Sequence, residues 1–144
     1  QDIIYVGGGN TKSMLAVWKE WNLNNILQDA YEKGIVMSGV SAGAICWFDK
    51  GITDSFANEL SIIDCLGIIK DVACPHFDEE KEREPYVNDV INKEIIKACI
   101  CIEGGCALHI KNELEYSSVD FDNGKRCYRV FKENNKLKKE PLLN

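Results

Sequence analysis

The amino-acid sequence predicts an α/β fold in which a mostly parallel sheet is flanked by helices. Two short apolar runs, "DIIYV" at residues 2–6 and "IVMSGV" at residues 35–40, are typical of parallel strands buried on both faces. Helical periodicity fills the stretch between them. This alternation favours parallel strands joined by right-handed crossovers, as in class I glutamine amidotransferase-like or flavodoxin-like sheets.

The helices between these strands are predicted from apolar spacing and from their ends. Asn10 and Thr11 are good N-caps, and the apolar residues after them recur every three or four positions, up to Trp21. A second helical pattern follows and stops at Gly34, a residue type that commonly closes helices in the left-handed conformation.

The rest of the chain continues this pattern less regularly. Residues 42–51 are predicted to form a helix, residues 71–80 a loop-rich segment, and the stretch from Tyr86 to Asn92 a further helix. Two strands are expected to meet at Gly104 and Gly105, and "ENNK" is expected to turn a closing hairpin.

Length and charge restrict the function classes. The 144 residues favour a single domain over residues 1–144, and the 45% hydrophobic and 28% charged content is ordinary for a soluble protein. The net charge of −6 disfavours nucleic acid and anionic membranes as partners, and no apolar run reaches the roughly 20 residues of a membrane span.

The seven cysteines mostly lie in apolar stretches, where thiols behave as small hydrophobic groups. This usage favours a reducing, cytoplasmic location. The cysteine spacing does not fit a zinc site, and "GGGN" at residues 7–10 matches no phosphate-binding fingerprint, so we expect neither a metal nor a cofactor.

The pentapeptide "GVSAG" at residues 39–43 satisfies G-x-S-x-G between a predicted strand and a predicted helix. In that context a sharp turn exposes the serine oxygen of Ser41 and aims the next backbone N–H, that of Ala42, at developing negative charge. The alternative is a tight turn whose glycines serve packing alone. "GGGN" also follows a strand, so its amides could hold an anion in the same crevice, although a merely flexible turn is the competing interpretation.

A serine nucleophile requires a base, and the chain has two histidines. His109 is interpreted as a structural strand residue, whereas His76 follows Pro75 in a polar loop that could hold an imidazole over the turn. Chain position leaves the acidic partner open among the aspartates at 49, 54, 64 and 78 and the neighbouring glutamates.

Four stretches, "YVGGGNT", "GVSAGAICWF", "GITDS" and "CPHFDEE", resemble the dipeptidase E (aspartyl dipeptidase) family of serine peptidases. That family is similar to cyanophycinase and shares its fold with class I glutamine amidotransferases. The resemblance covers most of the chain and weakens after Asn112.

The resemblance implies a role for several residues. Ser41 would be the nucleophile, His76 the general base and Asp54 the acidic residue of the triad. Gly9 and Ala42 would supply the N–H groups of the oxyanion hole. Arg83 would bind an acidic group of the substrate.

Members of the family usually have strands and helices before the glycine turn, whereas this chain starts just ahead of "YVGGGNT" without a methionine. We therefore expect the C-terminal portion of a longer family domain, truncated at its N-terminus. An edge or face of its sheet should then need a partner, either the missing N-terminal segment or a second copy in a homodimer.

The sequence thus predicts a serine-type peptidase that hydrolyses dipeptides or short peptides, with N-terminal aspartate as the preference implied by the family. Another acyl-transfer reaction on the same scaffold is the first alternative. A catalytically inactive, truncated binding or scaffold domain is the second. A cysteine mechanism through Cys46 is the third and is disfavoured, because that residue lies inside the predicted helix.

Overall fold

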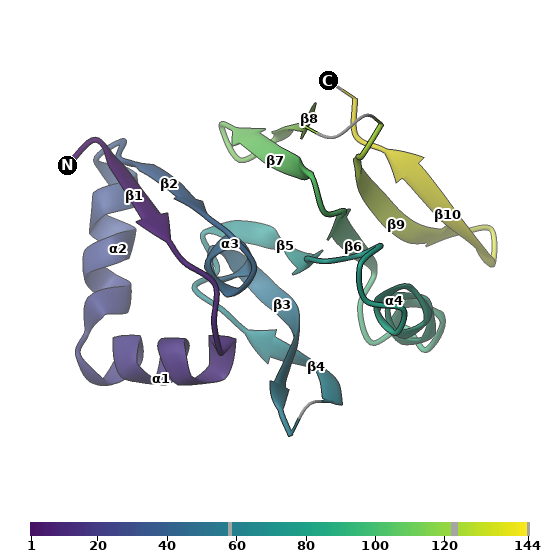
Figure 1. The fold of residues 1–144 in the computed structure, drawn as a ribbon, viewed down its shortest axis with the longest axis horizontal. Coiled ribbons are helices and arrows are strands. Elements are labelled where there is room, and N and C mark those ends of the chain that lie inside the picture. Colours follow the sequence, from purple (N-terminus) through teal and green to yellow (C-terminus); the bar gives the residue numbers. More distant parts are fainter. Residues whose placement is uncertain (58, 122–123, 144) are drawn as a thin grey trace. The chain divides into compact units, whose positions relative to one another are not determined.

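A computed structural model describes residues 1–57, 59–121 and 124–143 (Figure 1). The chain divides into two compact units, Gln1–Lys70 and Asp71–Asn144. Each unit combines helices and strands, which confirms the α/β class, while the prediction of a single domain remains a prediction. Within the described residues, no helix is long and apolar enough to cross a membrane.

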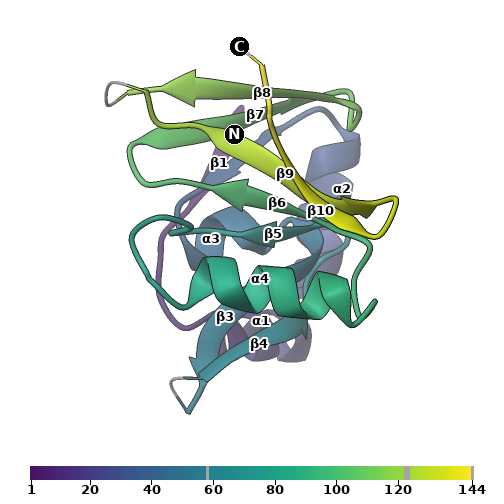
Figure 2. The same ribbon diagram turned by 90° about the vertical axis from the view of Figure 1, so that its right-hand side faces the viewer.

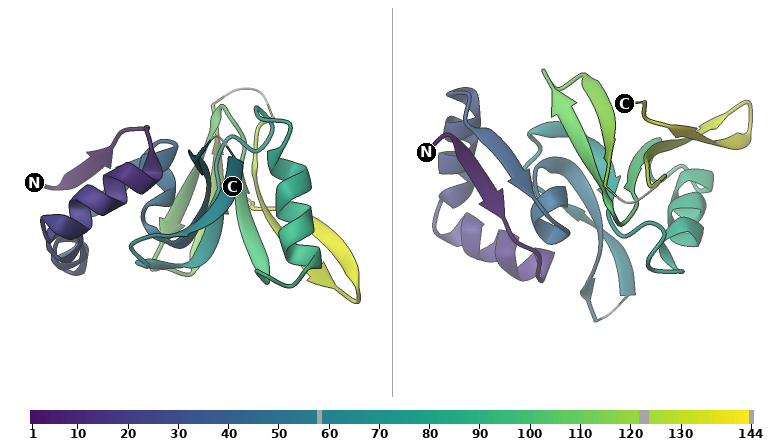
Figure 3. Two further views of the ribbon diagram at one scale, coloured as in Figure 1. Left: turned by 90° about the horizontal axis from the view of Figure 1, so that it is seen from below. Right: turned by 45° about the horizontal axis from the view of Figure 1, so that its top comes forward.

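The first unit starts with two parallel strands, β1 (Ile3–Val6) and β2 (Val36–Gly39), joined by helices α1 (Thr11–Glu20) and α2 (Leu23–Glu32). Asn10 caps α1 by accepting a hydrogen bond from the Ser13 N–H (2.9 Å). Gly34, with φ of 84°, closes α2 as predicted. Both helices lie on the same side of the strand pair (Figure 3).

The β1–β2 pair is not buried on both faces, so that part of the sequence prediction is wrong. Ile3, Tyr5 and Val36 are 61%, 67% and 56% exposed, and the register pairs Ile3 with Val36. Alternate residues of a strand point to opposite faces, so these side chains form one uncovered apolar face. We call Ile3, Tyr5 and Val36 the apolar strand face.

The predicted helix over 42–51 is also wrong in extent. Helix α3 covers Ala42–Ile45, and the chain then enters a strand, β3 (Phe48–Phe56), that forms a hairpin with β4 (Glu59–Asp64). Pairing with β4 leaves Ile52 fully buried, and Gly51 lets the Ile45 side chain pack against β3. Strand pairing of these β-forming residues is a tertiary contact that outweighs the local helical pattern.

The second unit is built on strands β6 (Ala98–Ile102), β9 (Cys127–Glu133) and β10 (Lys136–Pro141) and on β5 (Ile69–Cys74) from its third residue onward (Figure 2). Helix α4 (Arg83–Asn92) buries Val87, Val90 and Ile91, confirming the predicted helix. The strands β7 (Cys106–Lys111) and β8 (Glu115–Asp120) form a separate hairpin.

The expectation of a mostly parallel sheet is wrong, because the described pairings are mixed. β1–β2 and β5–β6 are parallel, whereas β3–β4, β6–β9, β7–β8 and β9–β10 are antiparallel. Three of the antiparallel pairs, β3–β4, β7–β8 and β9–β10, are formed by consecutive strands with short turns, and a tight turn can join only antiparallel strands. The predicted "ENNK" turn is one of them: Asn134 and Asn135 adopt φ of 50° and 60°, as in a type I′ hairpin turn.

Strand β5 occupies part of the segment predicted to be loop-rich. Ala73 and Cys74 are fully buried and pair with Ile100 and Cys101 of β6. The two strands are far apart in the sequence. Residues 71–74, which precede Pro75, therefore gave little local indication that they form a strand.

Aromatic and cationic side chains support both units. In the first, the Trp18 and Trp47 rings lie 6.4 Å apart between centroids. In the second, the Lys139 ammonium lies 4.7 Å from the centroid of the Phe77 ring and 4.6 Å from that of Tyr128.

Two glycines next to the β2–α3 turn are required by backbone contacts. A Cβ atom on Gly39 would lie 2.7 Å from the Val6 carbonyl oxygen, and one on Gly43 would lie 2.7 Å from the Gly7 carbonyl oxygen, with other backbone atoms closer still. Real Cβ atoms do not approach backbone this closely, so an alanine at either position must displace β1.

We therefore predict that Gly43→Ala lowers the free energy of unfolding by about 3 kcal/mol, through overpacking that rigid backbone atoms cannot relieve. Gly7→Ala is the matched control, because nothing lies within 4 Å of its added Cβ; its cost should stay below about 1 kcal/mol. Urea denaturation followed by circular dichroism measures both. Equal stabilities of the two variants would contradict the close approach.

Candidate active site

Ser41 occupies the strained turn that the sequence predicts for a nucleophile. It lies between β2 and α3 with φ of 55° and ψ of −118°, a region that residues other than glycine rarely adopt. Hydrogen bonds fix the turn on both sides: Val40 N–H donates to the Val6 carbonyl (3.1 Å), and Gly43 N–H donates to the Val40 carbonyl (2.9 Å). The strain is thus maintained by the surrounding backbone.

The glycine turn after β1 lies against Ser41, as the two parallel strands predict. A Cβ atom added to Gly8 would be 3.3 Å from the Ser41 Cβ and 3.8 Å from its Oγ. Gly9 follows with φ of 149°, and Ala42, 3% exposed, is the first residue of α3. The first N–H groups of a helix have no partner within it, so the Ala42 N–H is of the kind an oxyanion requires.

Asp54, the acidic residue implied by the family resemblance, belongs to this first unit. It is exposed on β3, between Thr53 and Ser55. Those two neighbours bind the start of α1: the Thr53 and Thr11 hydroxyls are 3.2 Å apart, and the Thr11 N–H donates to the Ser55 hydroxyl (2.9 Å). Asp54 therefore lies on the strand that is anchored to the start of helix α1.

His76 lies in the second unit, directly beyond the end of β5. Its φ of 52° is another positive value for a residue other than glycine. Its Nδ1 is 2.6 Å from Glu79 Oε2. Since Nδ1 then carries the hydrogen that is donated to the carboxylate, Nε2 is the nitrogen that accepts a proton, as a general base requires.

Glu79 is the residue that chain position alone did not select. It was one of the glutamates near His76 among which the sequence left the acidic partner open. A spacing of three residues in a polar loop was the only available signal, and it is weak because such runs are commonly solvated. The side chains of His76 and Glu79 are 32% and 52% exposed, so the contact orients the ring more than it stabilises the fold.

The loop after His76 is attached to the turn between β6 and β7. Phe77 N–H donates to the Ile102 carbonyl (3.0 Å), and Gly104 N–H donates to Asp78 Oδ1 (2.8 Å). Glu79 packs over Gly104, which has no side chain to obstruct it. The loop therefore has a fixed support at the carboxyl ends of the parallel strands β5 and β6.

Asp78 is held ionised by its partners. Partial burial raises the pKa of Asp78. Hydrogen bonds from Lys125 and from the Gly104 N–H lower this pKa by more than burial raises it, so the net shift is downward. At neutral pH this carboxylate is consequently suited to hold the turn.

Arg83 is placed differently from the prediction of an accessible substrate ligand. Its side chain is 3% exposed, and its Nε donates to Glu80 Oε2 at 2.8 Å. This arrangement favours a structural role at the start of α4. Substrate binding by Arg83 remains a prediction from the family resemblance.

The cysteine alternative is not supported by the surroundings of Cys46. The residue is fully buried, its Sγ donates to the Gly43 carbonyl (3.3 Å), and burial raises the pKa of its thiol well above the usual range. His109 lies exposed on β7, in keeping with a strand residue. Among the described residues, His, Cys, Asp and Glu side chains form no group of three able to hold a metal ion.

The strain at Ser41 predicts an unusual order of stabilities. Ser41→Gly and Ser41→Ala both remove the hydroxyl, but glycine adopts the observed φ and ψ without a steric penalty. Ser41→Gly should therefore be more stable than Ser41→Ala by about 1 kcal/mol. Thermal unfolding of the two purified variants tests this order, and a more stable alanine variant would contradict the strained turn.

Comparisons with known proteins identify the family of the chain. The model of peptidase family S51 matches residues 1–115. A curated relative, "Uncharacterized peptidase YgaJ" of Bacillus subtilis (strain 168), is 41% identical over 141 residues, which are 98% of this chain and 61% of the relative. The chain thus spans less than two thirds of that relative's length. The glycine turn, the strained serine and the family match lead to one conclusion: this chain belongs to peptidase family S51, the dipeptidase E family of serine peptidases.

Proposed function

We propose that the chain carries the nucleophile and the general base of a serine peptidase that hydrolyses dipeptides or short peptides. The observation that carries this proposal is the backbone of Ser41, held at φ of 55° beside the glycine turn. A strained conformation that the surroundings maintain is typical of functional positions, and the strand-to-helix turn of G-x-S-x-G is the context in which a serine acts as a nucleophile.

In the proposed reaction, His76 Nε2 takes the proton of the Ser41 hydroxyl while Oγ attacks the carbonyl carbon of the peptide bond. The N–H groups of Gly9 and Ala42 stabilise the oxyanion. The amine leaves with the proton that His76 returns. Water, deprotonated by His76, then hydrolyses the acyl-enzyme and releases the acid.

The acidic member of the triad has two candidates with different support. Glu79 is supported by its 2.6 Å contact with His76 Nδ1, and Asp54 by the family resemblance. Glu103 is a third carboxylate to test, because it lies beside Gly104 in the turn that supports the His76 loop, where its Oε2 accepts the Arg126 N–H (3.0 Å). The resemblance also suggests N-terminal aspartate in the substrate and Arg83 as its ligand.

An inactive binding or scaffold domain is the second candidate function, and the apolar strand face favours it. Ile3, Tyr5 and Val36 are more than half exposed, and the relative is longer than this chain. We propose that this face is covered either by the part of the family domain that lies outside this sequence or by a second copy of the chain.

We also propose a reducing, cytoplasmic location, which the buried cysteines support.

Fluorophosphonate labelling tests the nucleophile. The parent chain should gain one adduct in its intact mass, whereas Ser41→Ala should gain none and His76→Ala should react at least about 100-fold more slowly, because general base catalysis is lost. Ser38→Ala is the matched control: it removes the hydroxyl that donates to the Ile4 carbonyl and should still be labelled. An unlabelled but folded parent would favour the scaffold alternative.

The same assay ranks the acids. Glu79→Gln, Asp54→Asn and Glu103→Gln each keep the side-chain shape and remove the charge. Loss of the carboxylate that holds Nδ1 should slow labelling by roughly 100-fold, and the other two changes should have little effect. If Glu79→Gln is labelled as fast as the parent, Glu79 is not the acid of the triad, and its contact with His76 is only a surface ion pair.

A further inference from the structure

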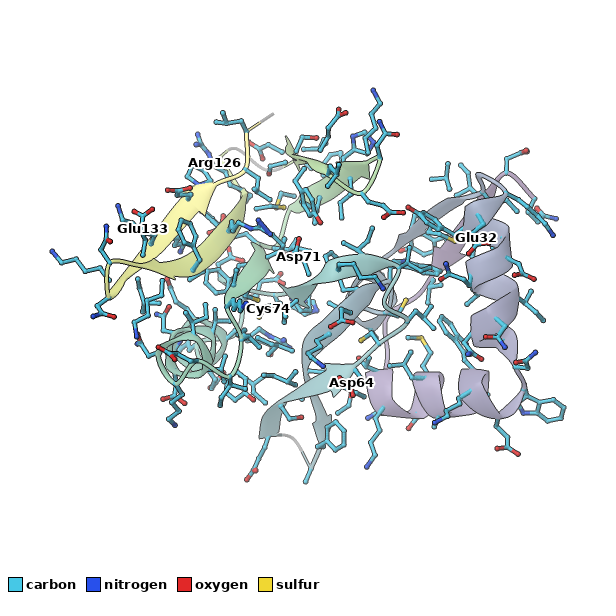
Figure 4. The ribbon with its side chains drawn as sticks, turned by 180° about the vertical axis from the view of Figure 1, so that it is seen from behind. Glu32, Asp64, Asp71, Cys74, Arg126 and Glu133 are labelled. Atoms are coloured by element: carbon cyan, nitrogen blue, oxygen red, sulfur yellow. The ribbon has the colours of Figure 1, made fainter. Side chains whose placement is uncertain are left out.

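Two cysteines from different strands lie in direct contact in the second unit. Cys106 begins β7 and Cys127 begins β9, and their Sγ atoms are 3.6 Å apart. Their neighbours along the chain are also joined, because the Glu103 N–H donates to the Arg126 carbonyl (3.3 Å) and Glu103 Oε2 accepts the Arg126 N–H (3.0 Å). Arg126, labelled in Figure 4, leads into the start of β9.

We propose that Cys106 and Cys127 form a reversible disulfide when the protein meets a small-molecule disulfide oxidant such as oxidised glutathione. A disulfide bond is about 2.05 Å long, so the sulfur atoms must approach each other by roughly 1.5 Å. This movement is small for a residue at the start of a hairpin strand. The proposal does not depend on the peptidase activity.

The surroundings of the two thiols assign their order of reaction. Cys106 is half-buried, and its Sγ donates to the Glu103 carbonyl (3.2 Å), whereas Cys127 is fully buried. The oxidant therefore reaches Cys106 first. Burial raises the pKa of both thiols, and the Ser118 hydroxyl, which accepts the Cys127 N–H (2.9 Å), opposes part of this rise.

The chemistry is two successive thiol–disulfide exchanges. The Cys106 thiolate attacks one sulfur of oxidised glutathione, forms a mixed disulfide and releases one glutathione thiolate. The Cys127 thiolate then attacks the Cys106 sulfur, forms the internal disulfide and releases the second glutathione. Two protons and two electrons leave the cysteine pair, and the oxidised glutathione becomes two molecules of reduced glutathione.

The reaction should be slow at neutral pH. Burial raises the pKa of Cys106, and burial together with the adjacent Cys106 raises the pKa of Cys127 to about 12. The nearby Glu103 carboxylate acts in the same direction on both thiols. Below its pKa a thiol gains about tenfold in thiolate fraction per pH unit, so oxidation should be faster at pH 9 than at pH 7.

The position of the pair links it to the His76 loop. The turn between Cys106 and strand β6 contains Gly104, whose N–H donates to Asp78 and over which Glu79 packs. A disulfide would connect that turn covalently to β9 and restrict its movement. The oxidised protein should consequently unfold at a higher temperature than the reduced protein.

The full chain is treated with oxidised glutathione, unreacted thiols are blocked with N-ethylmaleimide, and the denatured protein is digested with trypsin. Cleavage after Arg126 and Arg129 isolates Cys127 in a tripeptide, and cleavage after Lys97 and Lys111 releases the peptide that carries Cys106. The expected product joins these two peptides, at least about tenfold above any other cysteine pairing, and is separated by dithiothreitol.

Two variants assign the bond. Cys106→Ser should abolish the cross-link, although Cys99 and Cys101 lie in the same tryptic peptide, and Cys65→Ser, a half-buried thiol in the first unit, should retain it. Cys106→Ala replaces the serine variant if circular dichroism shows that the latter is unfolded. Absence of the cross-link in the folded parent, its persistence in folded Cys106→Ser, or a dominant bond between other cysteines would each overturn the proposal.

Discussion

The close approach of the β1 backbone to the β2–α3 turn is the constraint on which the candidate site depends. Gly39 and Gly43 leave space for the carbonyl groups of Val6 and Gly7, and the Val40 N–H completes the contact by donating to Val6. Because the backbone is fixed on both sides of Ser41, that residue has no relaxed conformation to adopt. The energetic cost of the turn is thereby offset by the hydrogen bonds and packing around it.

The candidate nucleophile and general base follow one rule in the two units. Each unit contains a parallel strand pair, and Ser41 and His76 come after the carboxyl ends of those strands, as is usual for ligand sites in α/β sheets. The first unit gathers Ser41 with the glycine turn, and the second gathers His76 with Glu79. Ser41 and His76 also share a positive φ, which marks both as positions where the surrounding structure imposes a conformation that the side chain disfavours.

The sequence predicted the features that depend on local chemistry. Asn10 caps a helix through its own side chain, Gly34 adopts a conformation suited to glycine, and the G-x-S-x-G context located the strained serine. Strand β3 was missed because its pairing with β4 outweighs the local helical pattern, and β5 was missed because its partner β6 is distant in sequence. Glu79 could not be selected because residue type and spacing do not reveal which carboxylate of a polar loop meets His76 Nδ1.

The distribution of aromatic residues has a practical consequence for following unfolding. All three tryptophans, at positions 18, 21 and 47, belong to the first unit. The Trp47 ring packs beside that of Trp18, and Trp47 follows the candidate nucleophile closely in the sequence. Intrinsic tryptophan fluorescence therefore reports on the unit that carries Ser41 and is blind to the unit that carries His76. Tyrosines occur in both units, Tyr5 and Tyr31 in the first and Tyr86, Tyr116 and Tyr128 in the other, so tryptophan fluorescence is the signal that is specific to one half of the proposed chemistry.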